Sequence, residues 1–223
     1  MSRSRIIPLL LLIMLVTLVF TGCSGPPEGS AEWYFEQAHE YAVQGDFDEA
    51  VRQYSNAIEI NPEMAQAYVN RAAAYASKEN YEKAVDDCSI AVDLEPELTL
   101  AYINRAYAYN ALGQYDLAII DCTNAIDLDR SIAEAYINRA HAYNGIRKYS
   151  LAVADCNKVM EIVDESEATL AYYQRGLGYK GLGEKEKAVE DLEKFLTLST
   201  NTLWSEAAQW EIDHIDDEPI EEE

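Results

Sequence analysis

Three cysteines, Cys88, Cys122 and Cys156, are the residues whose type and spacing first suggest metal binding or disulfide chemistry. The interval between neighbours in this set is constant (122 − 88 = 156 − 122). Equivalent positions of adjacent packed helical units lie about 8–10 Å apart, beyond the roughly 7 Å Cα separation that a disulfide tolerates. Tyr54 and Leu192 hold the same position in the outer units. The pattern therefore predicts buried apolar filler positions and neither a disulfide nor a metal site.

No other group of residues predicts an active site. Gly176, Gly178 and Gly181 match the letters of a dinucleotide-binding loop, but no strand precedes them and they fall inside an expected helix. The histidines form no pair at metal-ligand spacing on one helix; they are His39, His141 and His214. The sequence therefore predicts no enzyme, no catalytic residues, no cofactor, no metal and no small-molecule substrate.

The charge balance argues against nucleic acid as a partner. The 223 residues carry 40 Asp and Glu against 17 Lys and Arg, a formal net charge of −23. Such a charge repels phosphate backbones and anionic lipid head groups. We therefore expect a protein partner.

The N-terminus has the composition of an export signal. Arg3 and Arg5 precede an almost wholly apolar run over residues 6–20, which leads through small residues to Cys23. The run is shorter than the roughly 20 residues that span a bilayer, so a permanent transmembrane helix is the weaker reading.

The segment Phe20-Thr21-Gly22-Cys23 resembles the bacterial lipobox, although that motif usually has Leu or another aliphatic residue in place of Phe20. The resemblance implies lipidation of Cys23, a signal peptide at 1–22, a tether at 23–30 and an exported lipoprotein anchored in a membrane of the cell envelope, facing the extracytoplasmic side. An uncleaved anchor, or an ordinary cleavage that leaves an unmodified thiol, remains open.

A constant repeat period organises the rest of the chain. Tyr68, Tyr102 and Tyr136 are separated by the same interval as the cysteines (102 − 68 = 136 − 102 = 122 − 88). Apolar and small residues recur at helical spacing inside each unit. Each unit is therefore expected to be two antiparallel helices.

The run Tyr102-Ile-Asn-Arg-Ala106-Tyr-Ala-Tyr109, with Gly113, Tyr115, Ala118 and Ala125 after it, resembles the tetratricopeptide repeat. This resemblance implies an all-α, right-handed superhelical solenoid of about five helix-turn-helix repeats. The expected repeats are 31–64, 65–98, 99–132, 133–168 and 169–200.

A capping helix is expected at 201–215, before an acidic tail at 216–223. Leu203, Ala207 and Trp210 lie on one face of that helix, and this apolar face is expected to cover the last repeat.

Charged residues also recur with the repeat. An Arg on the first helix of units two to five is followed sixteen residues later (87 − 71) by an Asp on the second, and unit one has Gln at both places. Because the two positions change together, the pattern predicts structural salt bridges within the repeats. The pairs are Arg71–Asp87, Arg105–Asp121, Arg139–Asp155 and Arg175–Asp191.

The resemblance places a peptide-binding groove along the first helices, with a row of amide side chains at its centre. An amide can bond both the N–H and the C=O of a peptide backbone. The amide row is Asn70, Asn104, Asn138 and Gln174, and the flanking residues are Phe35, Ile103, Tyr107, Ile137, His141 and Tyr173.

Two functions fit these features. The first is a non-catalytic scaffold that binds an extended or amphipathic peptide of an envelope partner in its groove. The alternative is an accessory subunit of an envelope enzyme complex that docks through its convex face or acidic tail.

Overall fold

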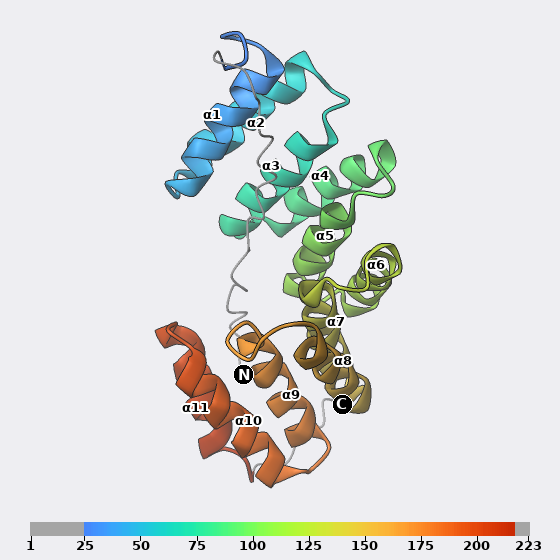
Figure 1. Ribbon diagram of the computed structural model, residues 1–223, viewed down its shortest axis with the longest axis vertical. Helices are drawn as coiled ribbons and strands as arrows, with labels where there is room; N and C mark the ends of the chain where they lie inside the picture. The colour runs from blue at the N-terminus through green and yellow to red at the C-terminus, as the bar shows by residue number, and fades with distance from the viewer. Residues whose placement is uncertain (1–24, 217–223) are drawn as a thin grey trace. The chain divides into compact units, whose positions relative to one another are not determined.

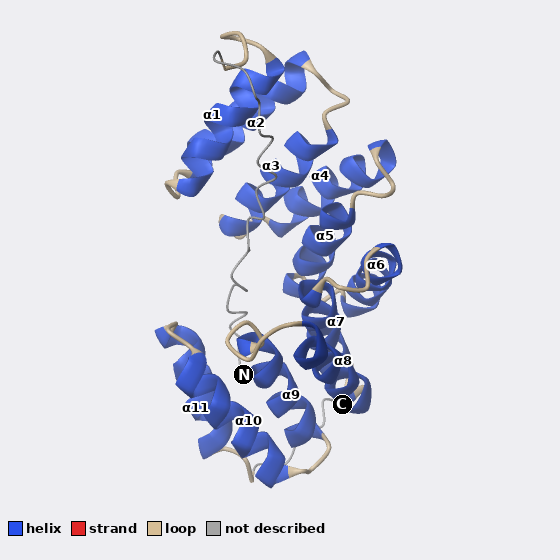
Figure 2. Cartoon of the chain, viewed as in Figure 1, coloured by secondary structure: helices blue, strands red, loops and turns tan. Residues whose placement is uncertain are grey.

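The computed structural model describes residues 25–216 of the chain. Over these residues there are eleven α-helices and no strand. Figure 2 accordingly colours this part of the chain as helix and loop alone. The predicted all-α class is therefore confirmed. The predicted signal peptide, Cys23 and most of the acidic tail lie outside the described residues.

Residues 25–112 belong to a first compact unit, here called the N-terminal unit. Its helices pack in chain order, each on the next, and the first helices of successive repeats also touch one another. The helices, labelled in Figure 1, are α1 (Ala31–Val43), α2 (Phe47–Ile60), α3 (Ala65–Ser77), α4 (Tyr81–Leu94) and α5 (Thr99–Ala111).

Residues 113–216 belong to a second compact unit, the C-terminal unit. It repeats the same packing, with α7 and α9 touching and each helix lying on the next. Its helices are α6 (Tyr115–Leu128), α7 (Ala133–Gly145), α8 (Tyr149–Ile162), α9 (Thr169–Gly181), α10 (Lys185–Leu198) and α11 (Thr202–Asp213). The first helices of the five repeats thus begin at the residues where the sequence places the five units.

The turn between the two helices of each repeat contains one residue with a left-handed backbone. Gly45, Gly113 and Gly183 have φ of 80°, 72° and 76° at this place. Glu79 and Arg147 adopt φ of 58° and 59° at the corresponding places. This conformation closes the first helix and lets the chain reverse, and glycine adopts it without a steric cost.

The three cysteines occupy the filler positions that their period predicts. Cys88, Cys122 and Cys156 are fully buried. Burial raises the pKa of the Cys122 and Cys156 thiols. Both are therefore inert core residues, in agreement with the sequence-based prediction.

The glycines of α9 allow close helix packing. A Cβ at Gly181 would lie 2.4 Å from the Tyr149 ring, and one at Gly178 would lie 2.9 Å from Val153. Both distances are too short for a side chain, so these glycines let α8 approach α9. The glycines of α9 therefore match the letters of a dinucleotide-binding loop because close helix packing requires glycine at these positions.

The prediction for the capping helix is wrong about which face is buried. In α11, Trp204 and Ala208 are 5% and 0% exposed, whereas Leu203 and Trp210 are 61% and 54% exposed. The indole of Trp204 packs edge-on against another aromatic ring, and this contact sets the rotation of the helix.

The ring that meets Trp204 is that of Tyr173 in α9, with the two ring centroids 5.1 Å apart. The ion pair from Lys180 to Glu211 supports the same rotation, and Lys185 pairs with Asp216 just beyond the end of α11.

The left-handed turn position yields a stability prediction. Replacing Gly45 with Ala should lower the free energy of unfolding by about 1–2 kcal/mol, because a Cβ is strained at positive φ even though nothing lies within 4 Å of it. Chemical denaturation measures the change. Glu79→Ala is the matched control and should be near neutral, because Glu79 already carries a Cβ in this conformation. Equal losses in both variants would contradict the backbone explanation.

Candidate functional site

An arginine on the first helix joins three helices in the repeats. Arg139 of α7 donates from Nε and Nη2 to the two oxygens of Asp155 in α8, at 2.7 and 2.8 Å. Its third nitrogen, Nη1, donates to Thr123 Oγ1 of α6 at 3.1 Å. One guanidinium therefore ties its own repeat together and links it to the previous one.

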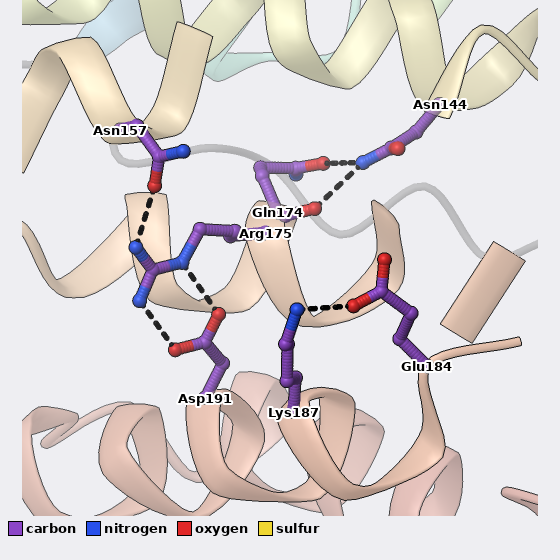
Figure 3. A network of polar contacts seen from close by, with 7 residues as sticks. All are labelled: Asn144, Asn157, Gln174, Arg175, Glu184, Lys187 and Asp191. Carbon is purple, nitrogen blue, oxygen red and sulfur yellow. Dashed lines mark hydrogen bonds and ion pairs between the residues drawn. The ribbon is translucent and has the colours of Figure 1, made fainter. Parts of the chain in front are cut away.

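The same arrangement recurs at two other arginines. Arg71 bonds both oxygens of Asp87 at 2.7 Å and Ser55 at 2.9 Å. Arg175 holds Asp191 at 2.6 and 2.7 Å and Asn157 at 2.7 Å. Figure 3 draws these three bonds as dashed lines. Two further residues, Arg105 and Asp121, belong to different units, so their pairing stays a prediction.

The guanidinium groups are also enclosed by tyrosine rings one helical turn away on each side. Arg139 lies 5.6 and 5.9 Å from the ring centroids of Tyr136 and Tyr143. Arg71 and Arg175 have the same neighbours three residues before and four residues after them. Aromatic faces attract a cation, so they support the guanidinium without competing for its hydrogen bonds.

The sequence analysis did not identify the polar residue of the preceding repeat that bonds each arginine. Its regular recurrence is nevertheless visible in the sequence. Ser55, Ser89, Thr123 and Asn157 recur at the interval of the repeat, and each accepts a bond from the arginine of the following repeat. The three hydroxyls donate their own protons to the carbonyl four residues earlier, at 2.7 Å. Their lone pairs are therefore directed at the arginine.

The predicted amide row divides by unit. In the N-terminal unit, Asn70 of α3 and Asn104 of α5 are half-buried. In the C-terminal unit, Asn138 of α7 and Gln174 of α9 are only 3% and 0% exposed. The peptide-binding role of the row stays a prediction, and Asn70 and Asn104 are its accessible members.

Gln174 is held by a hydrogen-bond network between α7 and α9. Asn144 Nδ2 donates to the Gln174 backbone oxygen at 2.8 Å and to its Oε1 at 3.1 Å (Figure 3). With Oε1 accepting, the Gln174 amide nitrogen faces His141 Nδ1 at 3.2 Å and donates to it. Asn144, which the sequence analysis did not single out, thus sets the orientation of both partners.

His141 is kept neutral by its surroundings. Burial lowers the pKa of His141 to about 4, because the charged imidazolium is poorly solvated there. The bond from Gln174 to Nδ1 also requires an unprotonated nitrogen. His141 therefore acts as a structural acceptor at neutral pH.

Most of the predicted groove flank is packed between helices. Ile103, Tyr107 and Ile137 are buried, while Phe35 is half-buried. Tyr173 is buried between Phe195 of α10 and Trp204 of α11, at 5.2 and 5.1 Å between ring centroids. These side chains hold neighbouring helices in register.

Comparison with known protein families gives an independent test of the repeat. Models described as tetratricopeptide repeat match residues 35–99, 99–132, 133–162 and 170–202. The chain belongs to the tetratricopeptide repeat family. A comparison with curated protein sequences gave no match.

Solved structures share the tetratricopeptide fold. YrrB, "a TPR protein with an unusual peptide-binding site", is 23% identical, with a TM-score of 0.62, over 81% of this chain and 92% of that one. MamA from Desulfovibrio magneticus RS-1 is 19% identical, with a TM-score of 0.66, over 75% and 94%. The first TPR of Spaghetti (RPAP3), bound to the HSP90 peptide SRMEEVD, is 27% identical, with a TM-score of 0.52, over 56% and 98%.

The described part of this tetratricopeptide protein contains neither a metal-binding cluster nor a membrane-spanning helix. Within residues 25–216, no cluster of His, Cys, Asp and Glu is placed to hold a metal ion. None of the helices in that range is long and apolar enough to cross a membrane.

The arginine network yields a stability prediction. Arg139→Met should lower the free energy of unfolding by about 3–5 kcal/mol, because it leaves Asp155 buried without its cation. Denaturant titration measures the loss, and the double variant Arg139→Met/Asp155→Leu should recover part of it. The control, Lys158→Met, breaks an exposed pair with Glu161 and should cost no more than about 1 kcal/mol. A loss from Arg139→Met no larger than the control would contradict this role.

The buried histidine yields a pH prediction. The unfolded chain protonates His141 near pH 6.5 whereas the folded chain does so near pH 4. The unfolded state therefore binds more protons between these values, and stability should fall as the pH drops from about 6.5 to 4. His141→Gln should lose less stability across this window in denaturation experiments. An identical pH slope in both proteins would be the contrary result.

Proposed function

We propose that this tetratricopeptide protein is a non-catalytic, lipid-anchored scaffold that binds an extended or amphipathic peptide segment of an envelope partner. The observation that carries the proposal is the pair of half-buried amides, Asn70 and Asn104, on the adjacent first helices α3 and α5. Solenoids of repeated helix pairs generally bind their partners on an extended concave surface.

The amide pair suits backbone recognition. Each amide offers two N–H donors and one acceptor, so it can bond a peptide without reading its side chains. Phe35 is half-buried at one edge of the same unit and adds apolar surface. Glu32 and Glu36 on α1 are exposed, and their charge disfavours an acidic ligand.

Two structural neighbours support peptide binding by analogy. YrrB is described as having a peptide-binding site, and the first TPR of RPAP3 is bound to a peptide. The RPAP3 ligand SRMEEVD is acidic. With exposed Glu32 and Glu36 and a net charge of −23, this chain instead favours a neutral or basic segment.

The anchor is proposed from the sequence around Cys23. A diacylated cysteine supplies two acyl chains, and stable membrane anchoring requires more than one. An acidic protein is repelled by anionic lipid, so a covalent anchor would provide the membrane affinity that the folded part lacks. A partner in the cell envelope is part of the same proposal.

Photo-crosslinking tests the groove. A photoreactive residue at position 104 should give discrete adducts with an envelope protein, and Asn70→Leu should reduce their yield, because it removes a neighbouring backbone contact. The matched control places the crosslinker at Asp86, exposed on the second helix α4. Adducts at position 86 but not 104 would favour docking through the convex face and contradict the groove.

Intact mass tests the anchor. The membrane-extracted protein should begin at Cys23 and carry added acyl mass, because lipidation precedes cleavage in lipobox processing. A Cys23→Ala variant should keep the whole segment that precedes this position. Unmodified full-length mass in both proteins would overturn the proposed location while leaving the fold unchanged.

A further inference from the structure

The capping helix leaves an apolar surface without a partner. Leu203 and Trp210 are 61% and 54% exposed, and Ala207 lies between them on the same face of α11. These three residues form a strip along one side of the helix, here called the α11 stripe. The residues that attach α11 to the last repeat lie on a different face, at Trp204 and Ala208.

The preceding first helix, α9, is covered by the helices that follow it in the chain. In α9, Tyr173 is covered by Phe195 of the following α10 and Trp204 of the following α11. By its order after α10, α11 takes the place of the first helix of a sixth pair. Within residues 25–216, no helix follows α11 to cover its outward side. The stripe is therefore an apolar surface that no later helix of the described residues covers.

The stripe is held in one conformation before any partner arrives. The Trp210 indole stacks on His214, with 4.3 Å between ring centroids and 19° between ring planes. His214 Nδ1 lies 2.8 Å from the Trp210 carbonyl oxygen, within hydrogen-bond distance. The ammonium of Lys180 lies 5.6 Å from the indole centroid and is bonded to Glu211. An aromatic anchor fixed in this way loses little side-chain entropy on binding.

The negative charge beside the stripe favours a basic binding partner. Glu206 and Asp213 are exposed and seven residues apart, so they lie on the same side of α11, next to the stripe. Two copies of the chain joined here would bring these carboxylates together, and each copy carries a net charge of −23. A basic surface would instead gain from both charges.

We propose that the α11 stripe is a docking site for an amphipathic helix of a partner protein, with an apolar face on Leu203 and Trp210 and Lys or Arg facing Glu206 and Asp213. The partner helix extends the array by one element. This site is separate from the amide pair on α3 and α5, and either one can bind without the other.

The experiment uses the full chain in phosphatidylcholine nanodiscs with a photoreactive residue at position 209, an exposed site next to Trp210 in the chain. The probe is a labelled amphipathic helical peptide of Leu and Lys. A peptide with the same Leu face and Glu in place of Lys is its counterpart. The Leu and Lys peptide should crosslink at saturable yield, and the Leu and Glu peptide should not, because its charge matches that of the flank.

Two double variants distinguish binding at the stripe from the general electrostatic attraction of a basic peptide to an acidic protein. Leu203→Ala/Trp210→Ala should raise the half-maximal peptide concentration by at least about tenfold. Leu117→Ala/Leu151→Ala removes two comparably exposed apolar side chains of the same unit. This control should change the half-maximal peptide concentration by less than about twofold. Unchanged thermal unfolding by circular dichroism shows that each variant is folded.

Several results would overturn the proposal. Absence of crosslinking with the basic peptide would do so, as would equal crosslinking of both peptides or an equal loss in the control variant. Crosslinks between two copies of the chain that disappear in Leu203→Ala/Trp210→Ala would assign the stripe to self-association instead.

Discussion

The repeats depend on arginine side chains that are each shared between two successive helix pairs. In a solenoid, stability is a sum of terms inside each repeat and terms between neighbours. Arg139 contributes to both, because two of its nitrogens hold Asp155 in its own repeat and the third reaches Thr123 in the previous one. Lysine could not replace it, since only the planar guanidinium directs donors along these three fixed lines.

The same close packing decides which amide side chains of the first helices are buried. In the C-terminal unit, α7 and α9 approach closely enough for Asn144 to bond Gln174 and for Gln174 to bond His141. These polar groups are used by the fold. In the N-terminal unit, Asn70 and Asn104 remain partly accessible. Groups of similar sequence position are thus buried in one unit and partly exposed in the other.

The candidate site was predictable in its positions and not in its accessibility. A fixed repeat period places equivalent side chains on equivalent helix faces, so Asn104 and Gln174 could both be assigned to the first helices. Whether an amide faces solvent depends on its neighbours. Asn144 is one such neighbour, and its bonds to Gln174 depend on the close approach of α7 and α9, which are separate helices in the sequence.

The sequence by itself determined the repeat boundaries and the Arg–Asp pairs seen at Arg71, Arg139 and Arg175. A strict repeat period places the helix ends and the facing side chains at equivalent positions in each unit. Tertiary structure alone decided which side of α11 is buried. Both sides of that helix carry a tryptophan and small apolar residues, so its periodicity is ambiguous. The contact of Trp204 with Tyr173 sets the rotation of α11 and leaves Trp210 exposed, since only one side of the helix can pack on the last repeat.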